Sequence, residues 1–244
     1  MNKVKSFFDD FVFHARVMPV LTAMFPVLLW GIYKGCIYKK ILEVSIYLFL
    51  SLIFLTFASK VAREFGKKYE KKMYKELGGM PTTIVLRFSD NTIDNVTKAR
   101  YHKALNEKLS DVSLPLSRQE ENSESDDMYI SAMNFLRNYA NDNREKYPRV
   151  YHELKEYNYW RNLYGSKIFA IAVYVVIAVR EVVLHKSFSV KELFEKPYPE
   201  YIAFIFMILG IGVICLFVNK DTVKRKAYDY AKTLAEVCET IWNS

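Results

Sequence analysis

Four apolar blocks alternate with strongly charged stretches along the 244-residue chain: Val17–Tyr33, Ile41–Ala58, Ile168–Leu184 and Ile202–Val218. A helix needs about 20 apolar residues to cross a bilayer, with a lower limit of about 17. Each block is close to that limit, and the four together predict four transmembrane helices. The alternative is four buried helices of a soluble protein, which fits poorly because the second and fourth blocks carry at most one charge each.

The spacing of the blocks predicts how the chain is organised. Only Lys34–Lys40 separates the first two blocks, so these should form a helical hairpin. The predicted fold is an all-α membrane protein with four transmembrane helices, arranged as two hairpins around a mainly helical cytoplasmic domain. Four regions follow: 1–58 with an amphipathic entry and the first hairpin, 59–167 with a stalk and a ligand-sensing domain, 168–218 with the second hairpin, and 219–244 with a basic C-terminal helix.

Basic residues predict the orientation. Near the spans, 18 Lys and Arg residues lie on the side of the termini and the central region, against six on the other side. Positively charged loops stay in the cytoplasm, so both termini and the central domain should be cytoplasmic. For a bacterial protein this predicts a multi-pass protein of the inner membrane, where the net charge of +8 also matches anionic lipids.

The central region has three parts. Val61, Phe65, Tyr69, Met73 and Leu77 recur every four residues, which predicts a helical stalk that ends at Gly78-Gly79. Residues 82–88 are rich in β-branched and apolar side chains, which favours a short extended segment. Residues 110–127 are acidic and rich in Ser and Pro, which is typical of a mobile loop. Pro148 should begin a long helix that continues into the third span.

The sequence contains no recognisable catalytic or metal-binding motif. His152-Glu153 does not extend to HExxH, no P-loop or GxSxG is present, and the three cysteines are scattered. We therefore expect that the chain is not an enzyme and needs no metal or cofactor.

Cations and aromatic rings mark a candidate nucleic-acid interface. Single-stranded nucleic acid binds cationic grooves with flat rings for stacking. The segment after Gly78-Gly79 and the start of the third span supply both kinds of side chain: Arg87, Lys98, Arg100, Tyr101, His102, Lys103, Trp160 and Arg161. The alternative is that Lys98–Lys103 form a solvated helix face and that the run with Trp160 and Arg161 forms an aromatic belt at the membrane edge.

Polar residues and a proline within the apolar blocks are the candidates for a pore or a gate: Thr22, Pro26, Ser51, Thr56 and Arg180. A pore needs polar groups that face one another across a bundle. Four spans enclose no obvious pathway within one chain, so a pore should form between copies. For Arg180, snorkelling of the side chain to the interface is the alternative.

The segment LGGMPTTIVLRFSDNTIDNVTKARYH, residues 77–102, resembles a motif of the Hailong protein A family, the membrane effectors of the bacterial Hailong anti-phage defence system. The resemblance covers about a tenth of the chain. It implies a tetrameric membrane protein held inactive by single-stranded DNA oligomers, which a partner nucleotidyltransferase makes. Degradation of the oligomers would then release an ion-conducting effector. The resemblance assigns no individual DNA-contacting residue.

Two other functions fit the same sequence. The first is a non-enzymatic membrane anchor or scaffold that recruits a cytoplasmic partner through the acidic loop 110–127. The second is a sensor that binds a cyclic nucleotide instead of an oligomer.

Overall fold

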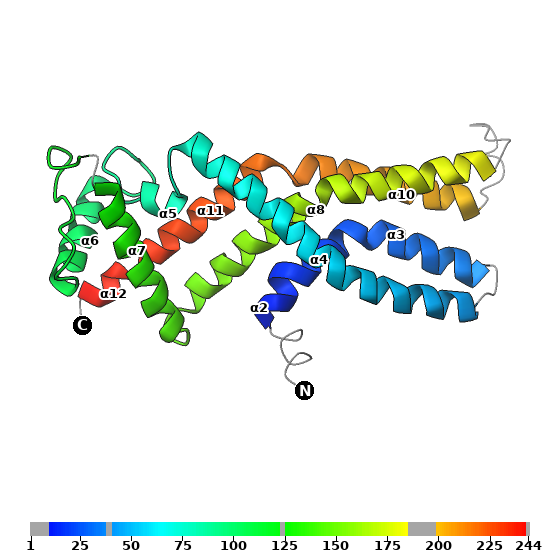
Figure 1. The fold of residues 1–244 in the computed structure, drawn as a ribbon, viewed down its shortest axis with the longest axis horizontal. Coiled ribbons are helices and arrows are strands. Elements are labelled where there is room, and N and C mark those ends of the chain that lie inside the picture. Colours follow the sequence, from blue (N-terminus) through cyan, green and yellow to red (C-terminus); the bar gives the residue numbers. More distant parts are fainter. Residues whose placement is uncertain (1–9, 38–40, 123–124, 185–198, 243–244) are drawn as a thin grey trace. The chain divides into compact units, whose positions relative to one another are not determined.

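The computed structural model describes residues 10–37, 41–122, 125–184 and 199–242, and these are helical apart from turns and connecting segments (Figure 1). They fall into two compact units. Unit 1 comprises residues Met1–Tyr69 and Asn158–Thr222, and unit 2 comprises Glu70–Tyr157 and Val223–Ser244. The amphipathic entry is expected over residues 1–16, and its first nine residues lie outside the described residues.

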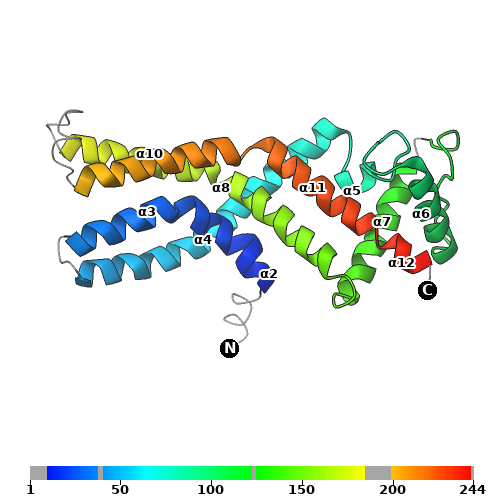
Figure 2. The same ribbon diagram turned by 180° about the vertical axis from the view of Figure 1, so that it is seen from behind.

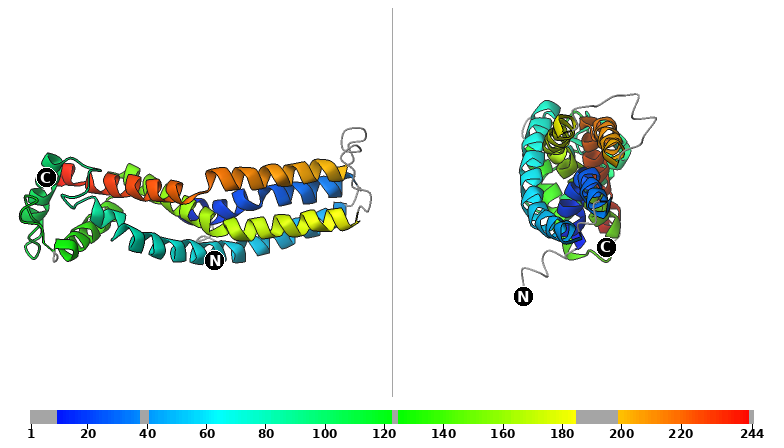
Figure 3. Two further views of the ribbon diagram at one scale, coloured as in Figure 1. Left: turned by 90° about the horizontal axis from the view of Figure 1, so that it is seen from above. Right: turned by 90° about the vertical axis from the view of Figure 1, so that its right-hand side faces the viewer.

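Unit 1 holds the apolar helices. The short α2 (Asp10–Val12) and the π-helix η1 (Phe13–Val17) lead into α3 (Met18–Ile37). The other helices of this unit are the first part of α4 (Ile41–Leu77), the second part of α8 (Pro148–Leu184) and α10 (Pro199–Phe217). The four long helices run side by side (Figures 2 and 3). Apolar and small side chains on their facing sides form the core, including Val20, Ala23, Leu55, Ala170 and Ile214.

Three helices are long and apolar enough to cross a membrane: Asp10–Tyr33, Leu42–Ile84 and Pro148–Arg180. The apolar part described in α10, Met207–Phe217, is shorter, so the fourth span and the two-hairpin layout remain predictions. Large apolar side chains on these helices are exposed, among them Leu42, Phe49, Leu52, Val176 and Leu216. Such a surface requires lipid or protein to cover it.

The helices α4 and α8 cross with their backbones in contact. A Cβ atom added to Gly165 would lie 2.2 Å from the carbonyl oxygen of Ala62 and 2.5 Å from the amide nitrogen of Gly66. Small residues permit this approach, as they do between membrane helices in general. The crossing therefore depends on the absence of a side chain at Gly165.

Unit 2 contains the last residues of α4, from Glu70, and the first residues of α8, up to Tyr157. The other helices of this unit are α5 (Pro81–Ile84), α6 (Asn95–Lys108), α7 (Ser125–Asp142), most of α11 (Lys220–Ala235) and α12 (Cys238–Trp242). Its core includes Leu86, Leu105, Tyr129, Met133 and Leu234, which are all fully buried. The predicted end of the stalk is confirmed, because α4 ends at Leu77 and Gly78 has a φ of 74° that glycine tolerates. The predicted helix start at Pro148 is also confirmed.

The extended segment predicted at 82–88 is wrong. Pro81 occupies the first turn of α5, and local backbone bonds continue through the segment, from Val85 N to Pro81 O (3.0 Å) and from Leu86 N to Thr83 O (3.2 Å). The described residues contain no strand with which such a segment could pair. Burial of the apolar side chains in this turn overrides their β propensity.

Candidate nucleic-acid interface and membrane cleft

Arg87 ties the end of α4 to the start of α7. Its guanidinium donates to both carboxylate oxygens of Asp126, at 2.8 Å from Nε and 2.6 Å from Nη2, and Nη2 also donates to Gly78 O at 2.8 Å. The hydrogen bonds to Asp126 raise the pKa of Arg87, and burial opposes them. A bidentate pair of this kind fixes geometry as well as charge. The donors of Arg87 that face Asp126 and Gly78 are thus engaged within unit 2.

Lys98 has no exposed surface. Its ammonium donates to the carbonyl oxygen of Arg87 at 2.7 Å and to that of Asp90. Burial lowers the pKa of Lys98, and the carboxylates of Asp90 and Glu121 oppose that shift. The side chain therefore anchors the turn after α5 to α6.

His102 is also fully buried, one helical turn after Lys98. Burial lowers the pKa of the imidazole, which favours the neutral ring. Its Nδ1 atom then donates to Pro115 O at 2.6 Å. The ring contacts Phe88 edge-on at 5.2 Å between centroids and Tyr129 at 5.3 Å. His102 thus joins α6 to the segment before α7.

Acidic side chains of the expected mobile loop take part in the same network. Glu121 accepts from the backbone amide of Phe88 (3.1 Å) and from the hydroxyl of Tyr129 (2.8 Å). Glu120 accepts from the amide of Leu116 and the hydroxyl of Ser117, and the first of these bonds lowers its pKa most. Residues 123–124 lie outside the described residues. In the described part, these two carboxylates are bonded internally.

Two other candidates on α6, Arg100 and Tyr101, face α12. Tyr101 is buried, and burial followed by the charge of Glu239 raises the pKa of its phenol. Arg100 forms an ion pair with Glu239 at 2.5 Å while remaining exposed. Lys103 is exposed. A buried side chain cannot touch a ligand in a folded unit, so the candidate interface on α6 reduces to Arg100 and Lys103.

Trp160 and Arg161 belong to unit 1 and not to unit 2, which contains the other candidates. Arg161 is 8% exposed and donates to Asn158 Oδ1 at 2.7 Å. The ring of Trp160 contacts Tyr159 edge-on, with 5.6 Å between centroids. The structure thus does not gather the eight predicted residues into one compact unit.

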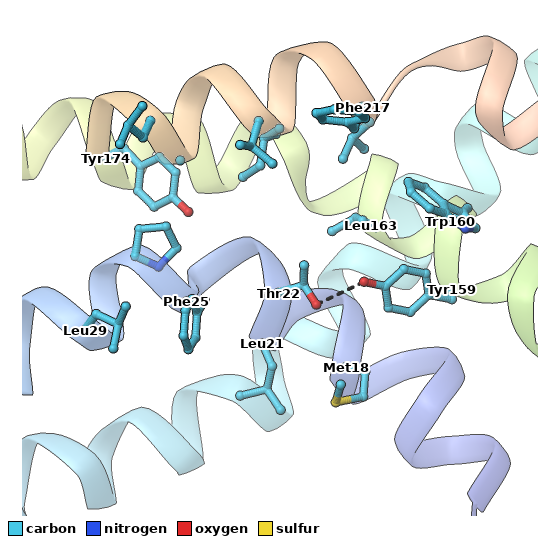
Figure 4. A pocket seen from close by; sticks show the side chains of 16 residues that line it. Met18, Leu21, Thr22, Phe25, Leu29, Tyr159, Trp160, Leu163, Tyr174 and Phe217 are labelled. Carbon is cyan, nitrogen blue, oxygen red and sulfur yellow. Dashed lines mark hydrogen bonds between the residues drawn. The ribbon is translucent and has the colours of Figure 1, made fainter. Parts of the chain in front are cut away.

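An apolar cleft of about 770 Å³ opens in unit 1 between α3, α8 and α10 (Figure 4). Among its lining residues, Thr22 and Tyr159 share a hydrogen bond of 3.0 Å. Pro26 lines the same cleft. Of the five residues predicted for a pore or a gate, only Thr22 and Pro26 line this cleft.

The other three pore candidates lie elsewhere. Ser51 is half-buried on α4, and Thr56 Oγ1 donates to Ile53 O at 2.7 Å within the same helix. Arg180 is exposed, with its guanidinium 6.0 Å from the ring centre of Trp30. This contact agrees with an interfacial position for Arg180. The five residues do not form one polar line in unit 1.

Helix α3 is irregular at two places, and polar side chains of other helices bond to backbone carbonyls near both. Pro26 has no amide hydrogen, so the carbonyl of Thr22 loses its helical donor. Two other carbonyls near Pro26 accept from tyrosines: Ala23 O from Tyr174, and Val27 O from Tyr47 at 3.0 Å.

The second irregularity is the π-helix before α3. Asn162, which is almost fully buried, donates to Ala15 O at 2.6 Å and so satisfies a carbonyl of this segment. Sequence reasoning missed Asn162 and Tyr174. The available signal was a lone polar side chain in or beside an apolar block, since such groups need a partner in the membrane.

No protein-family model matches the chain, and no curated protein or solved structure matches it. Among the described residues, no cluster of three or more His, Cys, Asp or Glu side chains could hold a metal ion. The function is therefore argued from the sequence and from the geometry above.

Proposed function

We propose that the protein is an oligomeric membrane effector of anti-phage defence that conducts ions across the bacterial inner membrane. Single-stranded DNA oligomers made by a partner nucleotidyltransferase bind it and hold it inactive. Their degradation by a phage nuclease releases the channel. A tetramer is the assembly that the sequence resemblance implies.

The observation that carries the proposal is the course of α4 and α8. Each helix has 37 residues, and each contributes its longer part, with the apolar block, to unit 1 and a shorter polar end to unit 2. An α-helix transmits an axial displacement because every peptide group is bonded to the next turn. A ligand bound by unit 2 can thereby act on helices that are long and apolar enough to span a membrane.

The irregular part of α3 supports the gating half of the proposal. A proline inside a helix and a π-helical segment are places where a helix bends. Here Pro26 and η1 lie on one helix, and side chains of α4 and α8 bond to its carbonyls. Displacement of α4 or α8 would therefore change the bonding of α3 at its two weakest points.

Reconstitution tests the proposal as a whole. The purified protein in liposomes should release a trapped ion, addition of single-stranded oligonucleotides should stop the release, and a single-strand nuclease should restore it. Double-stranded DNA of the same length is the matched control and should have little effect. Ion release that ignores both the oligonucleotide and the nuclease would refute the inhibitory role of DNA.

Two exposed residues test where the DNA binds. Arg100→Gln together with Lys103→Gln should weaken oligonucleotide binding without unfolding unit 2, because both side chains lie at the surface. Two lost phosphate contacts should reduce the slope of log K against log salt by about 1.4, since each contact to a single strand contributes roughly 0.7. Lys224→Gln with Lys232→Gln, two exposed positions on α11, is the control. Equal losses in the two double variants would argue against a defined site on α6.

A further inference from the structure

A second cavity in unit 1 has different chemistry from the apolar cleft. It has a volume of about 370 Å³ and lies between η1 and α4. Three of its lining residues are cations, one is an acid, and the others are hydroxyl-bearing or apolar: Val12, Arg16, Val17, Thr56, Ser59, Lys60, Arg63 and Glu64. The lining thus combines excess positive charge with apolar side chains.

The polar groups of the cavity differ in what they can offer a ligand. Thr56 and Ser59 already donate their hydroxyl hydrogens to helix carbonyls, at 2.7 Å to Ile53 O and 2.9 Å to Thr56 O. Glu64 pairs with Lys67 at 3.4 Å, which offsets part of its negative charge. The cationic side chains of the lining, Arg16, Lys60 and Arg63, are the groups whose charge attracts an anion into the cavity.

The position of the cavity in the chain identifies its ligand. Val17 begins the first apolar block and Ala58 ends the second, so both walls change from apolar to cationic at the cavity. This change is where a membrane helix leaves the hydrocarbon and enters the headgroup region. Basic pockets between helices on the cytoplasmic side of a membrane bind anionic lipid headgroups.

We propose that the cavity between η1 and α4 binds the phosphate of an anionic phospholipid through Arg16, Lys60 and Arg63. The glycerol end of the lipid rests on Val12 and Val17, and its acyl chains remain in the bilayer. Bound lipid joins the segment before α3 to the cationic turn of α4. The site is distinct from the candidate DNA interface on α6 and does not depend on it.

Lipid retention measures this binding directly. The protein is exchanged into nanodiscs that contain phosphatidylglycerol and phosphatidylcholine, and bound lipid is counted by native mass spectrometry after extraction into detergent. The wild-type protein should retain phosphatidylglycerol preferentially. Lys60→Ala with Arg63→Ala should weaken retention by roughly 25-fold, because each juxtamembrane cation contributes about fivefold.

Matched variants and competitors separate a lipid site from general charge effects. Lys71→Ala with Lys75→Ala removes two exposed charges from α4 outside the cavity and should leave retention unchanged. Neither inorganic phosphate nor a single-stranded oligonucleotide should displace the lipid. Lys60→Ala alone, at an exposed position, should show a smaller loss if the double variant folds poorly. Equal losses in both double variants, no preference for the anionic lipid, or displacement by the oligonucleotide would overturn the proposal.

Discussion

Replacement of Lys98 by methionine separates a structural role from a DNA contact. The side chain is fully buried and holds two carbonyl groups, those of Arg87 and Asp90. Methionine keeps the apolar stem and the approximate length but removes the ammonium. Both carbonyls then lose the bond from Lys98, and only Arg87 O keeps a second donor, the amide of Asp90.

The magnitude follows from the two hydrogen bonds. A bond that involves a charged group contributes about 1.5–3 kcal/mol, and a buried carbonyl without a partner costs a similar amount. The variant also avoids the desolvation of the ammonium that lowers the pKa of Lys98, and this offsets part of the loss. We expect a net destabilisation of about 3 kcal/mol, whereas Lys103→Met on the same helix should change stability by no more than about 0.5 kcal/mol.

Hydrogen exchange of backbone amides is the appropriate assay because it reports local opening in the full-length protein. The amides of Arg87 and Asp90 bond to Ile84 O at 3.0 Å and to Arg87 O at 3.1 Å. A loss of about 3 kcal/mol should speed their exchange by roughly 150-fold. If exchange is unchanged in Lys98→Met and oligonucleotide affinity nevertheless falls, Lys98 contacts the DNA and the structural interpretation is refuted.

Three further predictions test other parts of the structure. Gly165→Ala should destabilise the protein by about 1–3 kcal/mol by overpacking the α4–α8 crossing. A Cβ atom at Gly212 would meet no atom within 4 Å, so the Gly212→Ala variant should have the same melting temperature in detergent as the wild type. Because burial lowers the pKa of His102 in the folded state, the unfolded state takes up the proton first as pH falls below about 6.5. Amide protection around His102 should therefore be complete above that pH and decrease below it. His102→Gln should remove this dependence, whereas His152→Gln, at an exposed position, should retain it. Burial raises the pKa of the Cys238 thiol to about 12, so a maleimide should label Cys238 at pH 8 only after unfolding. Rapid labelling at Cys238 in the folded protein, located by peptide mapping apart from the exposed Cys215, would contradict its buried position.

Local signals in the sequence predicted the helices and several of their ends correctly. Gly78 ends α4 because glycine accepts a positive φ, and Pro148 begins α8 because a first-turn amide needs no partner. Asp94 caps α6 by accepting from Thr97 N at 2.9 Å. These features depend on residues within one turn of each other, which a sequence displays directly.

The burial of Lys98 and His102 could not be predicted in the same way. Lysine is almost never fully buried, so a basic run on a helix favours an exposed face. Here the carbonyls that Lys98 bonds come from a turn whose direction depends on the packing of α5 against the core. The prediction of an extended segment at 82–88 was wrong for the same reason. Its β-branched and apolar side chains favour a strand, whereas the burial that imposes a helical turn depends on distant residues.

The burial also changes what the sequence resemblance can support. Residues 77–102 contain the glycines that end α4, the arginine that pairs with Asp126, and the buried Lys98, Tyr101 and His102. A motif composed largely of such residues specifies how unit 2 folds. In this chain the segment 77–102 therefore has a structural role in unit 2, and this role alone assigns no ligand contact to its buried residues. Loss of activity on changing a buried residue of the motif would not identify a DNA contact, unless amide exchange showed that unit 2 was still folded.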